Sequence, residues 1–256
     1  MLKFFRTIRK KLIEHPSKGR TGENVRKYLL YAIGEILLVV IGILIALQVH
    51  NWNEDQHFKN RMLTNILSIQ DDIQLEKNIL GNVIQTLRYQ VESAGSIVPV
   101  MESRDRTVQD SLKFILDFNR LTDTPIISRR SNTWDFLKAS GDISEFPDSE
   151  LLSMLQDYYS DLEQTAINFT NTAIPPRLEL RKLKYELFTD TEHRKFFPTN
   201  EPTAPGSAVY DSIFNDPRVL PLCRYIGNTS RFFENEFISI QKKSMDISDY
   251  INNNYR

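Results

Sequence analysis

The residues best suited to bind a metal are two histidines and a glutamate near position 50. His50, Glu54 and His57 are spaced i, i+4 and i+7, which places them on one face of a helix. Two imidazoles and a carboxylate can share a metal ion. A lone helix rarely encloses a metal, however, and no second helix is identified that would complete the ligand shell. We therefore interpret the three as polar interface residues and predict no metal site.

The rest of the sequence carries no recognisable catalytic or cofactor-binding motif. It contains no HExxH, no CxxC pair, no GxSxG, no Walker loop and no GxGxxG. Nine glycines leave little material for a phosphate-binding loop. The one cysteine, Cys223, has apolar neighbours in sequence, so we expect a buried free thiol and no internal disulfide. The sequence predicts no catalytic residue and no cofactor.

Glu35 is the one ionisable side chain inside a long apolar stretch, residues 28–49, which reads YLLYAIGEILLVVIGILIALQV. At about 1.5 Å per residue, such a helix crosses the roughly 30 Å hydrocarbon core of a bilayer. The stretch therefore predicts a transmembrane helix with an intramembrane carboxylate. Glu35 could be a proton- or ion-linked group, or it could stay protonated or reach Lys27 or a partner's polar group. We favour the second interpretation, because a single carboxylate makes no relay.

Three small residues in this stretch could let a second helix approach closely. Gly42 and Ala46 are four residues apart on one face, and Gly34 lies two turns earlier. The pattern is also common by chance in apolar helices. A homo-oligomer or a membrane-protein partner is thus one expectation for the helix.

Charge assigns the two ends of the apolar stretch to opposite sides of a membrane. Residues 1–27 contain nine Lys or Arg against two Glu, whereas the whole chain has a net charge of −1. Basic residues beside a spanning helix stay in the cytoplasm, which explains this tail without nucleic-acid binding. A cleaved signal would have a shorter apolar run and a small-residue cleavage site. We expect a retained anchor: a basic cytoplasmic tail (1–27), a transmembrane helix (28–49) and a periplasmic helical domain (50–256).

The block KYLLYAIGEILLVVIGILIALQVHNWNE, residues 27–54, resembles the hallmark segment of an uncharacterised family of single-span membrane proteins from Gram-negative bacteria. The segment WDFLKASGDISEFPDSELLSMLQDYY, residues 134–159, resembles a second block of that family. The resemblance implies a bacterial inner-membrane anchor and a helical periplasmic domain. It implies no activity, substrate or catalytic residue.

Apolar residues at alternating spacings of 3 and 4 predict that the anchor continues into a long helix. Only Glu76 interrupts this stripe, and we expect a turn around residues 95–105 to end it. The stripe consists of Met62, Ile66, Ile69, Ile73, Leu80, Val83 and Leu87. Further helices are predicted at 107–118 and 133–139, the latter capped by Ser131 and stopped at Gly141.

The second half of the chain predicts more helices and one irregular region. Asp148 or Ser149 should cap a helix that Pro175 and Pro176 end or restart, and Pro221 should open the last long helix. Residues 189–217 contain prolines and aromatics and are predicted to be a long irregular segment, our best candidate for a contact surface. The fold class is therefore all-α, with one N-terminal transmembrane helix continuing into a periplasmic antiparallel helical bundle.

Aromatic residues in the predicted helices are expected to belong to the core and not to a ligand cage. These residues are Tyr158, Tyr159, Tyr225, Phe232 and Phe233. The sequence thus favours a non-catalytic, membrane-anchored scaffold, accessory or sensor-like protein. The alternative is an ion-coupled or signal-transducing subunit of an inner-membrane complex that uses Glu35.

Overall fold

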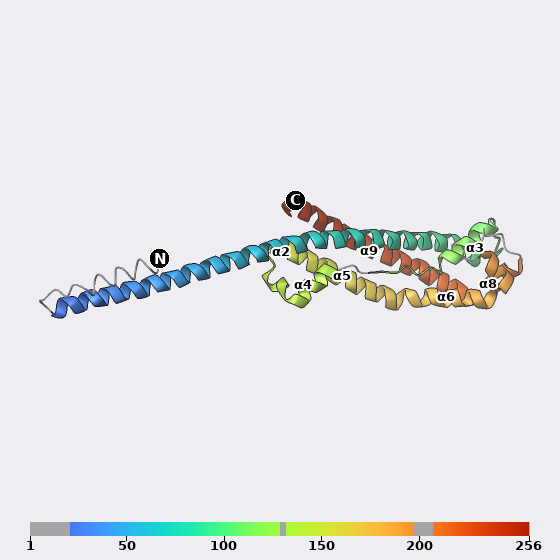
Figure 1. The fold of residues 1–256 in the computed structure, drawn as a ribbon. Coiled ribbons are helices and arrows are strands. Elements are labelled where there is room, and N and C mark those ends of the chain that lie inside the picture. Colours follow the sequence, from blue (N-terminus) through green and yellow to red (C-terminus); the bar gives the residue numbers. More distant parts are fainter. Residues whose placement is uncertain (1–20, 129–131, 197–206, 256) are drawn as a thin grey trace. The chain divides into compact units, whose positions relative to one another are not determined.

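A computed structural model describes residues 21–128, 132–196 and 207–255, and within these ranges the chain is helical with no strand. Figure 1 shows the elements in sequence colours. The helices are α2 (Thr21–Glu102), α3 (Ser111–Arg120), α4 (Asn132–Ser140), the 3-10 turn η1 (Asp142–Glu145), α5 (Ser149–Thr172), α6 (Ile174–Leu187), α7 (Asp190–Phe196), α8 (Ser207–Asn215) and α9 (Val219–Tyr255). The chain divides into two compact units, Met1–Asn60 and Arg61–Arg256, which we describe separately.

The first unit contains the N-terminal part of α2, which is long and apolar enough to cross a membrane. Its apolar side chains are exposed on all sides of the helix, among them Leu29, Ile36 and Leu44. A helix that is apolar all round has no polar face to turn toward water, as expected of a membrane span. Residues 1–20 of the basic tail lie outside the described residues.

The second unit is a helical bundle whose core is built from the predicted stripe of α2. All seven stripe residues, from Met62 to Leu87, are buried, which confirms this prediction. Helix α9 packs along α5 and then α6. Together α5 and α6 behave as one long element that is interrupted at Ala173, because Pro175 and Pro176 fit the first turn of a helix that restarts there.

The helix directions correct the expectation of a simple antiparallel bundle. Glu76 of α2 meets Tyr158 of α5, and Gln90 further along α2 meets Arg177 of α6, so these elements run parallel. Helix α9 runs antiparallel to α2, since Gln70 bonds to Asn252 near the end of α9. Helix α3 also runs antiparallel to α2, since Lys113 bonds to Ser96 and Asp117 to Ser93. The parallel arrangement is possible because the segment with α3 and α4 returns along the bundle before α5 begins (Figure 1).

The predicted turn at residues 95–105 is partly wrong, because α2 continues to Glu102 and the chain bends only at residues 103–105. Gly95 and Pro99 are exposed, so the backbone donor that Pro99 lacks lies on the solvent side of the helix. Ile97 and Met101 on the opposite side are buried in the core, and their burial holds this last part of α2 in place.

Several helix ends agree with the sequence, and others differ. Helix α4 ends at Ser140, and Gly141 follows with a positive φ of 81°, as predicted. Helix α3 begins at Ser111, later than predicted, because the Asp110 side chain accepts a hydrogen bond from Lys113 N. Ser131, the predicted cap of α4, lies outside the described residues. The prediction that residues 189–217 form a long irregular segment is partly wrong, because α7 and α8 lie within this range.

Asp148 joins the start of α5 to the end of α9. Its carboxylate accepts hydrogen bonds from Glu150 N and Leu151 N, as an N-cap does, and from the hydroxyls of Tyr250 and Tyr255. Desolvation acts to raise the pKa of Asp148, but the hydrogen bonds from Leu151 N, the tyrosines and Glu150 N outweigh it and lower this pKa. The carboxylate form is therefore the one that stabilises the fold.

We expect Asp148→Ala to lower the free energy of unfolding by about 1–2 kcal/mol, the usual effect of losing an N-cap. Because the folded-state pKa is depressed, the contribution is present above the ordinary value of 3.8 and is lost as the pH falls through the folded value. Urea unfolding at pH 7 and at pH 3 measures both effects. Asp161→Ala, which removes an exposed ion pair with Lys243, is the control and should change little. Equal effects of the two variants would contradict the stabilising role of Asp148 between α5 and α9.

Cys223 is buried in the core of the second unit, as expected, and burial raises the pKa of its thiol to about 12. Because the thiolate is the reactive form, maleimide should not label the folded protein at neutral pH. We expect complete labelling only after denaturation, and mass spectrometry of the intact chain measures it. Rapid labelling under native conditions would show that this part of the bundle opens.

Candidate functional site

The predicted membrane residues all lie in the first unit. Glu35 and Ala46 are exposed on α2, and nothing lies within 4 Å of a Cβ atom built on Gly34 or Gly42. A second helix therefore has room to approach at these glycines. The packing and ionic roles that the sequence suggested for the four residues stay predictions.

The structure pairs only two members of the His50, Glu54 and His57 group. His50 Nε2 lies 3.4 Å from Glu54 Oε1, and both side chains are largely exposed. Among the described residues, no three His, Cys, Asp or Glu side chains are placed to hold a metal ion. The three-residue metal hypothesis thus has no geometric support in this part of the chain.

The prediction that the five helical aromatics belong to the core is wrong for two of them. Tyr158, Tyr159 and Phe233 are buried, but Tyr225 and Phe232 of α9 are 45% and 58% exposed. Tyr225 and Phe232 are seven residues apart, so they lie on the same outer side of α9. Sequence analysis assigned Phe232 to the core together with its immediate neighbour Phe233, but only Phe233 lies on the buried side of α9.

The centre of the bundle contains a buried arginine that connects three helices. Arg177 of α6 is 0% exposed, and its Nε and Nη2 donate to Gln90 Oε1 of α2 at 3.0 and 2.7 Å. Its Nη2 also donates to Ser230 Oγ of α9 at 2.6 Å, and its Nη1 donates to the carbonyl of Ala173 at 2.5 Å. The last bond fixes the guanidinium to the junction between α5 and α6.

This arginine is stabilised by neutral acceptors. Within the described residues no carboxylate lies at ion-pair distance, although the ring of Phe169 lies 5.5 Å from Arg177 Cζ. Burial lowers the pKa of Arg177 to about 10, so it stays charged at neutral pH. Gln90 completes the layer, because its Nε2 donates to the carbonyls of Arg120 and Asp123. We call Gln90, Arg177 and Ser230 the central polar layer.

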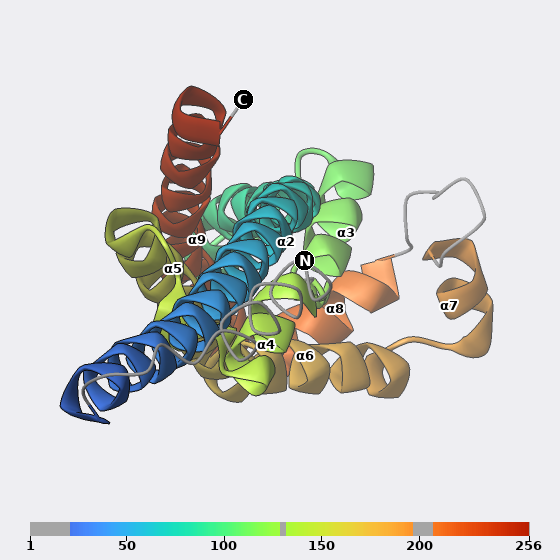
Figure 2. The same cartoon turned by 60° about the vertical axis from the view of Figure 1, so that its left-hand side comes forward.

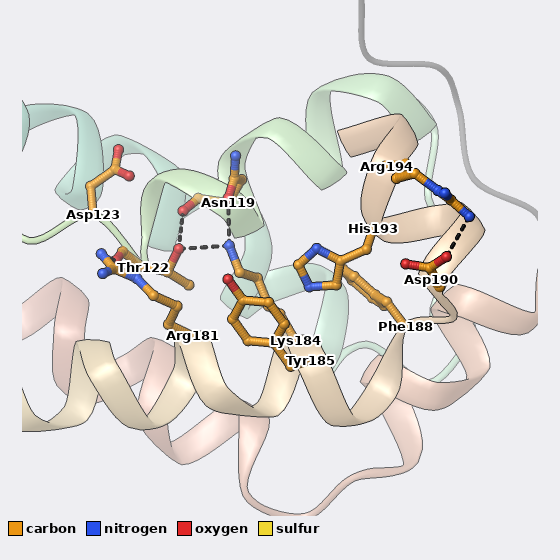
Figure 3. Close-up of a pocket in the computed structure, with 10 residues that line it drawn as sticks. All are labelled: Asn119, Thr122, Asp123, Arg181, Lys184, Tyr185, Phe188, Asp190, His193 and Arg194. Atoms are coloured by element: carbon orange, nitrogen blue, oxygen red, sulfur yellow. Dashed lines mark hydrogen bonds and ion pairs between the residues drawn. The ribbon is translucent and has the colours of Figure 1, made fainter. Parts of the chain in front are cut away.

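One turn and a half further along α6, a cleft opens between α3, α6 and α7 (Figure 3). Its volume is about 760 Å³. It is lined by Asn119, Thr122, Asp123, Arg181, Lys184, Tyr185, Phe188, Asp190, His193 and Arg194. A volume of this order suits a small organic molecule. Figure 2 shows α7 at the edge of the bundle, beyond the end of α6.

Two cations on α6 are held at the inner wall of the cleft. Lys184 is 3% exposed, and its Nζ donates to Asn119 Oδ1 at 2.5 Å and to Thr122 Oγ1 at 2.8 Å. Arg181 Nη2 donates to the carbonyl of Thr122 at 2.5 Å and to Thr124 Oγ1 at 3.1 Å. The oxygens of Asn119, Thr122 and Thr124 that accept these hydrogen bonds carry no formal charge.

Burial is the main influence on the charge of Lys184. It lowers the pKa of the ammonium to about 7, Asp123 acts in the opposite direction, and Arg181 lowers the pKa further. Lys184 therefore exchanges its proton near neutral pH, where an ordinary lysine is fully charged. Any anion that enters the cleft would favour the charged form.

The outer wall of the cleft is aromatic. The rings of Tyr185 and His193 are stacked with centroids 4.3 Å apart. Phe188 lies beside His193 (Figure 3) and packs against the core. Desolvation and the charge of Lys184 lower the pKa of His193, so its ring is neutral at pH 7. Arg194 and Asp190 of α7 form an ion pair with one another at the rim.

Comparison with known proteins places part of this chain in a wider group. Residues 35–160 match DUF6090, a family of unknown function. This match supports the expected resemblance to an uncharacterised family. No curated protein matches the chain, and no solved structure does.

The DUF6090 match includes some of the residues discussed above and excludes others. It includes Glu35, the bundle part of α2 and the α3 wall of the cleft, and it ends within α5. Arg177, Arg181 and Lys184 of α6 lie beyond it. The family model therefore covers one of the three residues of the polar layer and the α3 side of the cleft. Helices α6 and α9 supply the rest of the layer, and α6, Phe188 and α7 supply the rest of the cleft.

Sequence reasoning missed the residues of the polar layer and of the cleft, although signals existed. Gln90 occupies the position at which the α2 stripe should continue three residues after Leu87. Arg177 and Lys184 stand at spacings of 3 and 4 from Leu180, so they share its buried face. A polar residue at a stripe position indicates a buried hydrogen-bonded group when the neighbouring turns are apolar.

Proposed function

We propose that this protein is a single-pass inner-membrane protein of a Gram-negative bacterium that acts through contacts and without catalysis. Residues 1–27 form a cytoplasmic tail, residues 28–49 cross the membrane and residues 50–256 form a periplasmic helical domain. The role is that of a scaffold, accessory or sensor-like protein. The observation that carries the proposal is the helix with apolar side chains exposed all round its first part.

Two further observations support this function. The basic residues of the tail favour a cytoplasmic N-terminus, since an excess of Lys and Arg marks the inner side of a membrane. The second unit has a well-packed core, and its cleft and the exposed pair Tyr225 and Phe232 are suited to binding. The sequence provides no catalytic motif that would add a reaction to these contacts.

Mass spectrometry of proteins that co-purify with the chain after mild detergent extraction, together with the mass of the particle, tests this function. A stoichiometric membrane partner is expected for an accessory protein, and a homo-oligomer is expected for a self-contained scaffold or sensor. Gly42→Leu should weaken either assembly if the helix face at Gly42 and Ala46 is used. Turnover of a small molecule by the purified protein would contradict the proposal.

The alternative role, an ion-coupled or signal-transducing subunit, depends on Glu35. Glu35→Gln keeps the shape of the side chain and removes its charge. The variant should assemble with partners and stay active under our proposal, whereas an ion-coupled subunit would lose its function. The activity of the co-purified complex, compared between this variant and the natural chain at equal recovery of partners, distinguishes the two.

A further inference from the structure

The cleft between α3, α6 and α7 combines positive charge with fixed geometry. Arg181 and Lys184 lie one turn apart on α6 and face the same cleft. Thr122 contacts both of them, through its carbonyl and its hydroxyl respectively. This shared residue holds the two cations in place before any ligand arrives, and such preorganisation reduces the entropy lost on binding.

The other charged groups at the cleft leave a net positive charge. Asp190 and Arg194 of α7 pair with each other, so they cancel. Asp123, which follows α3, is the one carboxylate among the lining residues that opposes the α6 cations. Arg120 of α3 lies near enough to influence Asp123, and it also forms an ion pair with Asp117.

The apolar part of the cleft limits the class of ligand. Tyr185 is largely exposed, and with Phe188 and the His193 ring it offers aromatic surface beside the cations. A bare inorganic ion would leave this surface exposed to water. An anion with an apolar body would cover it and satisfy the guanidinium and the ammonium at the same time.

We propose that this cleft binds a small organic anion, a carboxylate or phosphate monoester. Arg181 and Lys184 hold the charged group, and Tyr185 and Phe188 contact its apolar part. The site deepens the proposed function, since it supplies the sensor-like bundle with a ligand.

Thermal unfolding of the full-length protein in detergent tests the site, with benzoate as the probe. Fluorescence of Trp134, which is buried and stacked on Tyr159, reports on the bundle. At ten times its dissociation constant, benzoate should raise the melting temperature by about 3 °C. Benzamide, which has the same shape without the charge, and acetate, which lacks the ring, should each raise it less.

Variants on one helix separate the site from a general charge effect. Arg181→Gln and Lys184→Met should abolish the benzoate shift. Lys182→Gln, at an exposed position outside the cleft, is the matched control and should keep it. Asp123→Asn removes the opposing carboxylate and should lower the dissociation constant of benzoate several-fold. Equal shifts in Arg181→Gln and Lys182→Gln, or no shift in the natural chain, would overturn the proposal.

Two readouts keep the test decisive if a cation variant fails to fold. Tyr185→Ala changes an exposed side chain, and it should reduce the benzoate shift to that of acetate. Binding of benzoate should also weaken between pH 7 and pH 9, because Lys184 loses its proton there. The other charged or titratable groups near Lys184 at this cleft are His193, Asp123, Asp190, Arg120, Arg181 and Arg194. Unchanged binding in both measurements would overturn the proposal, and that result would leave the membrane topology and the partner experiment unaffected.

Discussion

Arg177→Ala should lower the free energy of unfolding of the bundle by about 3–5 kcal/mol, which is a large part of the stability of a typical domain. The substitution removes the guanidinium from Gln90, Ser230 and the Ala173 carbonyl, and it leaves a cavity where α2, α6 and α9 meet. Both the lost hydrogen bonds and the cavity destabilise the fold. Urea unfolding of the full chain in detergent, followed by Trp134 fluorescence, measures the change.

Two other variants separate the causes of this loss. Arg177→Met fills most of the volume without a charge, and Ser230 Oγ and Gln90 Oε1, 3.0 Å apart, can still bond to each other. We therefore expect a smaller loss than for alanine. Arg231→Ala on α9 removes an exposed arginine and should change the stability by less than about 0.5 kcal/mol. A loss below about 1 kcal/mol for Arg177→Ala would contradict the central role of the polar layer.

Gly227→Leu should destabilise the bundle almost as strongly, because α2 and α9 approach closely at this residue. Even a Cβ atom at Gly227 would lie 2.5 Å from the Cβ of Ala94, a distance at which one helix must move. We expect Gly227→Ala to lower the free energy of unfolding by about 1–3 kcal/mol, and Gly227→Leu to lower it more. The same urea experiment measures both variants.

A reciprocal exchange tests whether contact between these two positions is the cause. In the double variant Ala94→Gly with Gly227→Ala, the methyl group moves to the other helix and the clash disappears. The double variant should therefore be more stable than the sum of the single effects predicts, with a coupling of about 1 kcal/mol or more. Gly95→Ala, where nothing lies within 4 Å, is the control and should be neutral or slightly stabilising. Additive effects at positions 94 and 227 would contradict the close approach.

Local patterns predicted much of the fold. The 3-and-4 spacing from Met62 to Leu87 identified the core side of α2, and the chemistry of Gly141 and Asp148 located two helix ends. The same spacing continues through Ala94, Ile97 and Met101, and the last two lie within the predicted turn. Giving this spacing more weight than Gly95 and Pro99 would have predicted the correct end of α2.

The candidate site could not be predicted in the same way, because separate parts of the chain assemble it. Lys184 is a ligand-binding candidate only since Asn119 and Thr122, more than sixty residues earlier, surround its ammonium. The parallel direction of α2 and α6 decides which residues meet, and the segment that returns along α2 before α5 begins sets this direction. When its hydrogen-bond partners are unknown, a charged residue on an apolar helix face is easily interpreted as a solvent-exposed residue at the edge of that face.

The most direct test of the membrane-anchored architecture is labelling with a membrane-impermeant maleimide in spheroplasts. Cys223 should stay silent because it is buried, so a single introduced cysteine reports its own side of the membrane. Asn253→Cys, at an exposed position near the end of α9, should be labelled in intact spheroplasts. Ser17→Cys, in the basic tail, should be labelled only after the membrane is permeabilised. Labelling of position 17 before permeabilisation, or protection of position 253, would contradict the proposed topology.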